Sequence, residues 1–165
     1  MIIRQEQKHD YRAIKQVTAD AFALMEHSDQ TEPAIIAALR DAGALTISLV
    51  AADGDEIIGH VAFSPVTIDG EDCNWFGLGP VSIRPDLQGR GIGSILIRRG
   101  LDKLRAQGAA GCVVLGDPGY YRRFGFENDR DLRYPGPPPE YFMRLTFGGS
   151  DPAGRVEYHA AFGAP

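Results

Sequence analysis

Apolar residues recur at helical spacing in two short segments near the N-terminus. In the first segment they return every three or four positions, which predicts a helix with one buried face. Asp10 stands where such a helix needs an N-cap. The second segment opens with Thr31 and Pro33 and ends near Gly43, which predicts another short helix. The apolar face of the first helix comprises Ile14, Val17, Ala21 and Phe22.

Residues 44–83 contain three β-favouring runs separated by turn dipeptides. The dipeptides are Asp53-Gly54 and Asp69-Gly70, and both favour tight hairpin turns. We therefore expect three consecutive strands that pair antiparallel in a meander.

The next part of the chain predicts a strand, a helix and another strand in succession. Residues 92–107 carry apolar residues at helical spacing, and Gly108 supplies a stop signal. The apolar run "CVVLG" at residues 112–116 predicts the following strand. A unit of this length requires parallel strands and a right-handed crossover. The predicted fold class is therefore α+β, or α/β in a looser sense. Its sheet is mixed, mostly antiparallel and twisted, flanked by helices, with a central βαβ unit.

Beyond this unit the patterns are shorter. Pro118 favours a short helix, whereas the proline-rich stretch Tyr134–Pro139 excludes regular structure. Tyr141–Phe147 and Arg155–Phe162 have strand-like patterns and predict a closing hairpin. Its aromatic residues are candidates for the core or for the contact of a homodimer.

Size, charge and cysteine content restrict the class of protein. With 165 residues, of which 44% are hydrophobic, the chain can close one sizeable core, so we expect a single domain over residues 1–165. A net charge of −5 and a pI near 5.3 argue against nucleic acid and membranes as partners. Cys73 and Cys112 suggest neither a disulfide framework nor a metal site. No signal peptide or membrane span is indicated, so the expected location is the cytoplasm.

Three alternate glycines, Gly89, Gly91 and Gly93, connect the meander to the long helix. Each can serve a tight turn with positive φ. Together they also leave unsatisfied N–H groups at the positive end of a helix, where an anionic phosphate can approach closely. Neither familiar phosphate loop fits. Ser94 stands where a Walker A loop needs lysine and where a dinucleotide fingerprint needs its third glycine.

Basic residues concentrate around these glycines. The segment from Arg84 to Arg105 has six basic and two acidic residues, a net charge of +4, so the rest of the chain sums to −9. This local reversal suits an anionic ligand, although basic residues on an exposed helix are often only solvated.

The stretch "VSIRPDLQGRGIGS" resembles the acetyl-coenzyme A loop of the GNAT superfamily of N-acetyltransferases. The family pattern Q/R-x-x-G-x-G/A is met by Gln88, Gly91 and Gly93, after a strand end that also matches. The later pattern Y-x-x-x-G-F is met by Tyr121 and the Gly-Phe pair at 125 and 126. The predicted order of elements resembles the GNAT fold over nearly the whole chain. "GCVVLGDPGYYRRFGF" is similar to a subgroup of small bacterial predicted acetyltransferases.

The resemblance implies that acetyl-CoA is the co-substrate. Its acetyl group would pass directly to a primary amine of a small molecule or a protein, without an acyl-enzyme. Backbone N–H groups within Pro80–Ile83 would polarise the thioester oxygen. Tyr121 would protonate the departing thiolate, since a phenol of pKa about 10 is protonated at neutral pH. The implied acetyl-CoA contacts are Val81, Ser82, Ile83, Gln88, Gly89, Arg90, Gly91, Ile92, Gly93, Ser94 and Tyr121.

No motif identifies the group that deprotonates the amine. Glu32 and His60 are candidates because both could face a cleft between the meander and the second helix, and Asp117 is a third candidate. Each has a structural alternative: Glu32 favours the helix dipole, His60 suits a partly buried core position, and Asp117 suits a helix cap. For Tyr120 we expect packing in the core.

Two other classes of protein would share the same loop. One is a non-catalytic sensor that binds acyl-CoA and contacts a partner protein, and the other is a nucleotide-binding module. Thiol release in the presence of amines favours the enzyme, and binding without release favours the sensor. Competition by ATP but not by coenzyme A favours the nucleotide-binding module.

Overall fold

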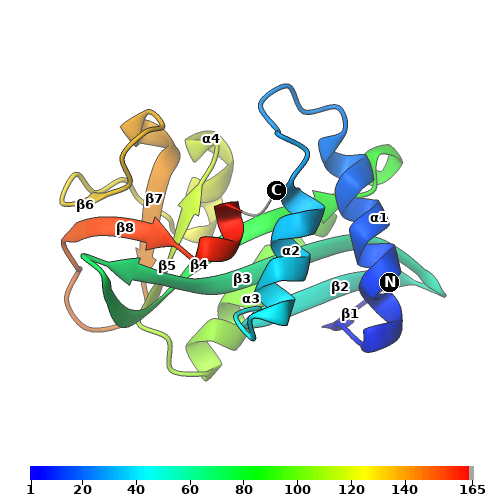
Figure 1. Cartoon of the computed structure of the whole chain (residues 1–165), viewed down its shortest axis with the longest axis horizontal. Coiled ribbons are helices and arrows are strands. Elements are labelled where there is room, and N and C mark those ends of the chain that lie inside the picture. The colour runs from blue at the N-terminus through cyan, green and yellow to red at the C-terminus, as the bar shows by residue number, and fades with distance from the viewer. Residues whose placement is uncertain (164–165) are drawn as a thin grey trace.

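In a computed structural model that describes residues 1–163, eight strands form one sheet with helices on both faces (Figure 1). Most neighbouring strands pair antiparallel, whereas β4–β5 and β6–β8 pair parallel. The predicted α+β class with a mixed, mostly antiparallel sheet is confirmed. The strands are β1 (Ile2–Gln5), β2 (Ile47–Asp53), β3 (Glu56–Ile68), β4 (Glu71–Ile83), β5 (Gly111–Leu115), β6 (Leu132–Arg133), β7 (Phe142–Thr146) and β8 (Gly154–Tyr158).

Four α-helices and five short 3₁₀ helices connect the strands. The α-helices are α1 (Tyr11–Phe22), α2 (Glu32–Asp41), α3 (Ile92–Ala106) and α4 (Pro118–Tyr121). The 3₁₀ helices are η1 (Lys8–Asp10), η2 (Pro85–Leu87), η3 (Arg122–Phe124), η4 (Pro139–Tyr141) and η5 (Ala160–Gly163). Among the described residues, no helix has both the length and the apolar character that a bilayer crossing requires.

The meander and the βαβ unit form as the sequence predicts. β2, β3 and β4 pair antiparallel in succession, and α3 links β4 to its parallel neighbour β5. Asp69 and Gly70 have φ values of 51° and 79°, the two positive φ angles that a type I′ hairpin turn requires. The dipeptide therefore sets both the position and the hand of this turn.

Two predictions about strands are wrong. β1 was not expected, and it pairs with the edge of β2. The expected closing hairpin does not form, because β7 pairs with β5 whereas β8 pairs with β3 and β6. β2 is shorter than β3 and leaves Val66–Ile68 of β3 without a partner on that edge. β8 occupies this edge, and β7 occupies the open edge of β5.

The expected cap of α1 also differs. Asp10 accepts no hydrogen bond from α1 and receives instead the N–H of Gln7 at 2.8 Å and the guanidinium of Arg4 at 2.6 and 3.0 Å. Arg4 lies within the unexpected strand β1, so this ion pair could not be anticipated.

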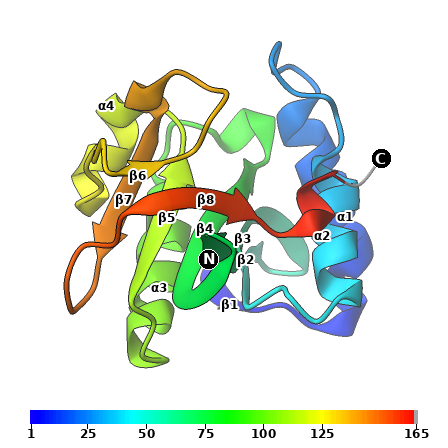
Figure 2. The same cartoon turned by 60° about the vertical axis from the view of Figure 1, so that its left-hand side comes forward.

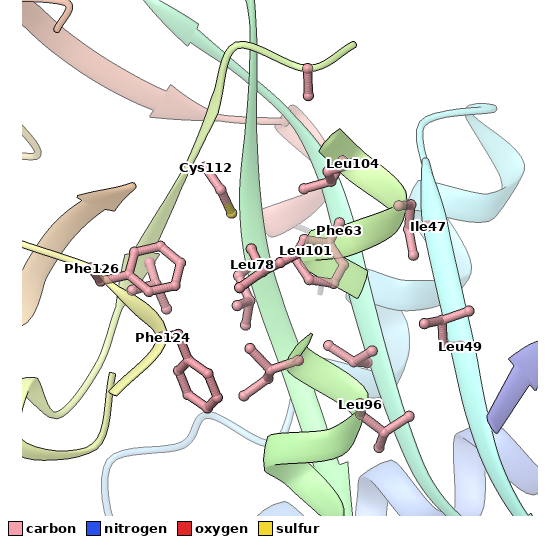
Figure 3. Close-up of a cluster of buried hydrophobic side chains, with 14 of the residues drawn as sticks. Ile47, Leu49, Phe63, Leu78, Leu96, Leu101, Leu104, Cys112, Phe124 and Phe126 are labelled. Atoms are coloured by element: carbon pink, nitrogen blue, oxygen red, sulfur yellow. The ribbon is translucent and has the colours of Figure 1, made fainter. Parts of the chain in front are cut away.

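The helices divide into two layers around the sheet (Figure 2). α3 covers one face, where Leu96, Leu101 and Leu104 pack against Phe63 and Leu49 of the sheet (Figure 3). The α1 and α2 helices cover the opposite face of the N-terminal strands, so the two faces of β3 and β4 meet different helices.

Candidate acetyl-CoA site

One edge of strand β4 is hydrogen-bonded to a neighbouring strand over only part of its length. Its first part pairs with β5, from Trp75 opposite Gly111 to Leu78 opposite Val114. β4 then has one extra residue relative to β3, a bulge between Leu78 and Val81, and bulges bend the strand that carries them. β5 ends at Leu115 and the chain turns away into α4. The end of β4 therefore diverges from β5 and keeps an unpaired edge.

The register shows which backbone groups lie on that edge. The N–H of Arg84 donates to the carbonyl of Ile58 at 2.9 Å, and Ile83 lies opposite Gly59. Because hydrogen-bonding direction alternates along a strand, the backbone of Ser82 faces β3, whereas the N–H groups of Val81 and Ile83 face the open edge. The side chains of Val81 and Ile83 pack against the α3-side core.

The chain after β4 folds into a loop whose amides are unpaired. Gln88 closes the strand end by donating its side-chain N–H to the carbonyl of Ile83 at 3.1 Å. From Gly89 to Ser94, no backbone N–H donates a hydrogen bond to a described residue. The first three residues of α3 are among these six, so their unpaired N–H groups lie at the positive end of the helix dipole. Such an array is suited to an anion.

The three glycines differ in backbone conformation and in the space around them. Gly89 and Gly91 have φ values of 79° and 83°, in the left-handed region, and a Cβ at either would meet no atom within 4 Å. Their role is to set the backbone of the turn. Gly93 has no such φ, but a Cβ there would lie 3.4 Å from the hydroxyl of Tyr120. This distance is close to ordinary van der Waals contact, so the described residues leave room for a Cβ at Gly93.

The loop borders a hollow of about 260 Å³ between β4, α3 and α4. Seven of the eleven predicted contacts line it, whereas Val81, Ser82, Arg90 and Tyr121 do not. The complete lining is Ile83, Leu87, Gln88, Gly89, Gly91, Ile92, Gly93, Ser94, Tyr120 and Arg123.

Tyr120 and Arg123 lie at this hollow, where the sequence did not place them. The hydroxyl of Tyr120 is 3.1 Å from Oγ of Ser94. Arg123 stacks over the Tyr120 ring at 4.3 Å and donates Nε–H to the carbonyl of Tyr120 at 2.8 Å. Their three-residue spacing after Pro118 would have placed both side chains on one face of a short helix. Tyr120 was expected to pack in the core with its hydroxyl satisfied; its ring does pack against the core, partly buried, and its hydroxyl lies at the loop.

Tyr121 lies behind Tyr120, packed against Gly116 and the core. Its ring meets that of Phe126 edge-on, with 6.1 Å between centroids, and a Cβ at Gly116 would lie 2.4 Å from it. Burial raises the pKa of Tyr121 to about 12, and the neighbouring Tyr120 and Cys112 add to the effect. The phenol is therefore protonated at neutral pH and can act as a proton donor.

The three candidate bases occupy different surroundings. Asp117 accepts a hydrogen bond from the N–H of Gly119 at 2.9 Å and caps α4, the structural role that the sequence offered for it besides catalysis. Glu32 is partly buried in the first turn of α2 and accepts a hydrogen bond from Ser28 at 2.7 Å. His60 is 0% exposed, so the expectation that it faces a cleft is not met. The structure does not bring these three side chains together.

The basic residues around the loop are not equally free. Arg84 is held by Asp86 at 2.7 Å and by Glu56 at 2.8 Å. Arg123 uses only its Nε within the described chain, which leaves its terminal amino groups for a ligand. Arg123, the basic residue in the lining of the loop hollow, therefore comes from η3, outside the basic segment from Arg84 to Arg105.

Two larger hollows lie elsewhere, each of about 630 Å³. One lies between α1 and α2, and the other is lined by the proline-rich stretch Tyr134–Pro139 together with Leu132 and Phe142.

Comparison with known proteins identifies the family. A family model described as an acetyltransferase (GNAT) domain matches residues 2–128. The uncharacterized N-acetyltransferase YhbS of Escherichia coli is 38% identical, with 98% of each chain covered. A crystal structure of YhbS in complex with CoA has a TM-score of 0.89 at 37% identity and covers 98% of this chain and 91% of that one.

A GNAT family acetyltransferase from Brucella melitensis, crystallised with acetyl-CoA, is more similar in sequence. It is 52% identical, has a TM-score of 0.89, and covers 98% of this chain and 97% of that chain. The family match spans more than half of the sequence, and the resemblance carried by Gln88, Gly91 and Gly93 is confirmed. The chain therefore belongs to the GNAT family of acetyltransferases.

Proposed function

We propose that this protein binds acetyl-CoA along the open edge of β4 and the loop from Gln88 to Ser94, and transfers the acetyl group directly to a primary amine. The observation that carries the proposal is the run of six unpaired backbone N–H groups from Gly89 to Ser94. A diphosphate offers the negative charge and the acceptor oxygens that such an array requires. Two relatives of high similarity were crystallised with acetyl-CoA or CoA.

The remaining groups of the site fit the other parts of the reaction. The N–H groups of Val81 and Ile83 face the open edge, where they can bind the pantetheine arm and stabilise negative charge on the thioester oxygen. Gly93 and Ser94 bring the loop against Tyr120, and Arg123 adds positive charge beside the phosphates. Arg90, exposed on the loop, is a further candidate for phosphate contact.

The transfer step requires one proton donor and one proton acceptor. The amine nitrogen attacks the thioester carbon, the carbon–sulfur bond breaks, and the thiolate takes a proton from Tyr121, whose high pKa keeps the phenol protonated. The amine loses one proton in return. Glu32 and Asp117 are the remaining candidates for accepting this proton. Each carboxylate already accepts one hydrogen bond, Glu32 from Ser28 and Asp117 from the N–H of Gly119 at the start of α4.

The acceptor is a primary amine of a small molecule or of a protein. Outside the segment from Arg84 to Arg105 the chain has a net charge of −9, so long-range electrostatic attraction favours a cationic acceptor. An amine that is protonated in solution is attracted by this negative charge, and it must lose its proton before it can attack the thioester.

Two measurements on the purified protein test the proposal. In thermal-shift titrations, CoA and acetyl-CoA should raise the melting temperature and ATP should not, because only ligands of the native state stabilise it. Thiol release from acetyl-CoA should then depend on an added amine. Binding without release across a broad amine panel would identify a non-catalytic acyl-CoA-binding protein. Stabilisation by ATP alone would identify a nucleotide-binding protein.

A further inference from the structure

The sheet face beneath α1 and α2 carries a row of buried polar side chains. Ser48, His60, Ser64 and Ser82 all lie on this face, and each is at most 1% exposed. The opposite face, toward α3, is apolar. Buried polar groups cost free energy unless they are hydrogen-bonded, so a row of four requires an explanation.

Half of the row belongs to a continuous hydrogen-bond chain that reaches the surface. Arg40 of α2 donates to both carboxylate oxygens of Glu6, at 2.9 and 2.8 Å. Oγ of Ser48 donates to the same carboxylate at 2.5 Å and lies 2.7 Å from Nε2 of His60. The side chain of Glu6 is 8% exposed and that of Arg40 is 18% exposed, so the chain ends at the protein surface.

The carboxylate fixes the direction of every bond in this chain. Burial would raise the pKa of Glu6, but hydrogen bonds from Arg40 and Ser48 outweigh it and hold the pKa below its usual value. An ionised carboxylate only accepts, so Ser48 gives its single proton to Glu6 and must accept from His60. His60 therefore carries its proton on Nε2 and presents a bare lone pair on Nδ1.

The electrostatic surroundings keep His60 neutral. Its complete burial, together with a smaller contribution from Arg40, lowers its pKa to about 4, against an opposing effect of Glu6. These are the charged groups that act on the imidazole, and the buried residues of α1, namely Ile14, Val17, Thr18 and Ala21, are all uncharged. Nδ1 of His60 has no hydrogen-bond partner among the described residues.

Ser82 is the next residue in line. It lies directly opposite His60 across β3 and β4, where side-chain Cβ atoms are about 4.5–5.5 Å apart. Its Oγ is buried and also has no partner. A rotation about its χ1 bond, or one bridging water, would join its O–H to Nδ1 of His60. Ser82 stands between Val81 and Ile83, whose N–H groups face the open edge, but its own Oγ is buried on the α1 side of the sheet, so its lone pairs reach the acceptor amine only through a bridging water.

We propose that these residues form an oriented proton path, which takes the proton of the acceptor amine from Ser82 through His60 to Glu6. This inference rests on the proposed function. An N–H bond of the ammonium breaks, and its proton passes through one bridging water to the buried Oγ of Ser82. The proton of Ser82 moves to Nδ1 of His60 while the Nε2 proton moves through Ser48 to Glu6. One proton leaves the amine, one reaches the carboxylate, and Glu6 then releases it to solvent.

The test compares Ser48→Ala and Glu6→Gln with Ser64→Ala as a matched control. Ser64 is a buried serine of the same sheet face whose hydroxyl has no partner, and it lies outside the path. The acceptor probes are the ε-amine of an Nα-blocked lysine, of pKa about 10.4, and the α-amine of a short peptide, of pKa about 8. Activity is measured as thiol release from acetyl-CoA between about pH 6 and about pH 11, a range that includes both amine pKa values.

We expect Ser48→Ala and Glu6→Gln to lower kcat/KM at neutral pH by at least about tenfold, because the loss of a group that takes part in proton transfer slows such reactions. The deficit should shrink as the pH approaches the pKa of each amine, because a neutral amine has one proton fewer to lose. Ser64→Ala should stay near the wild type, and all three variants should bind acetyl-CoA normally. Equal losses in Ser48→Ala and Ser64→Ala, or a deficit that does not change with pH, would overturn the proton path alone.

A second measurement, made on the wild type, needs no acceptor amine. Nitrogen-15 NMR of the imidazole, assigned with His60→Gln, should show Nε2 protonated and Nδ1 bare. Protonation of Nδ1 would reverse the chain and reject the path. A wild type that binds acetyl-CoA but acetylates neither probe nor any amine of the broader panel would instead reject the proposed function.

Discussion

Replacing Gly93 with proline should remove one N–H of the loop with little effect on the fold. Gly93 is the second residue of α3, its N–H donates to no described residue, and proline is tolerated in the first turn of a helix. A Cβ at this position would lie 3.4 Å from the Tyr120 hydroxyl and 3.7 Å from Cγ1 of Ile83, close to ordinary contact. Gly93→Ala adds the same atom and keeps the N–H, so it is the matched control.

The size of the effect follows from the lost hydrogen bond. A hydrogen bond to a charged group contributes about 1.5–3 kcal/mol, which corresponds to a roughly 10- to 150-fold change in Kd. Gly93→Pro should therefore bind CoA weaker than Gly93→Ala by that factor. The melting temperatures of the two unliganded variants should be similar, because the missing N–H has no partner within the described chain.

Isothermal titration of CoA into both variants measures the difference directly. Equal affinities would show that the N–H of Gly93 does not contact the ligand and that the helix N-terminus does not bind its phosphates. A large loss already in Gly93→Ala would assign the effect to space beside Tyr120 instead of the hydrogen bond.

Further predictions follow from other parts of the structure. Tyr121→Phe should lower kcat by about 10²-fold while the Kd of acetyl-CoA is unchanged, and an unaltered kcat would remove Tyr121 from the reaction. Arg123→Ala should weaken CoA binding, and the loss should diminish at high salt. Gly100→Ala should cost about 2 kcal/mol, or roughly 4–8 °C in Tm, because its Cβ would lie 2.1 Å from the Phe63 ring; an unchanged Tm would contradict this packing. Between pH 6.5 and pH 4 the unfolded chain binds a proton at His60 that the folded chain does not bind. The free energy of unfolding should therefore fall by roughly 3 kcal/mol as the pH drops through this range. Urea titrations should show a weaker fall for His60→Gln than for the wild type.

The sequence predicts most of the fold because its signals are local. The apolar spacing of α1 and α3 and the turn dipeptide at Asp69-Gly70 each act over a few residues, and the structure contains all of them. Strand partners are not local. β8 pairs with β3 because β2 is too short to cover the whole edge, and no pattern within 141–162 contains that information.

The candidate site divides in the same way. The glycine loop can be read from the chain, since positive φ at Gly89 and Gly91 is a property of single residues. The contact of Tyr120 with Ser94 joins residues 26 positions apart and appears only in the folded chain. The Glu6–Ser48–His60 chain depends on β1, whose short apolar run gave no strand prediction.

The most direct measurement is a titration of CoA into nitrogen-15-labelled protein, followed by amide chemical shifts. If the loop amides bind the diphosphate, the signals of Gly89 to Ser94 should shift downfield together and saturate at the Kd found by calorimetry. Saturable CoA binding that leaves those six amides unshifted, and moves signals around either of the larger hollows instead, would contradict the proposed site.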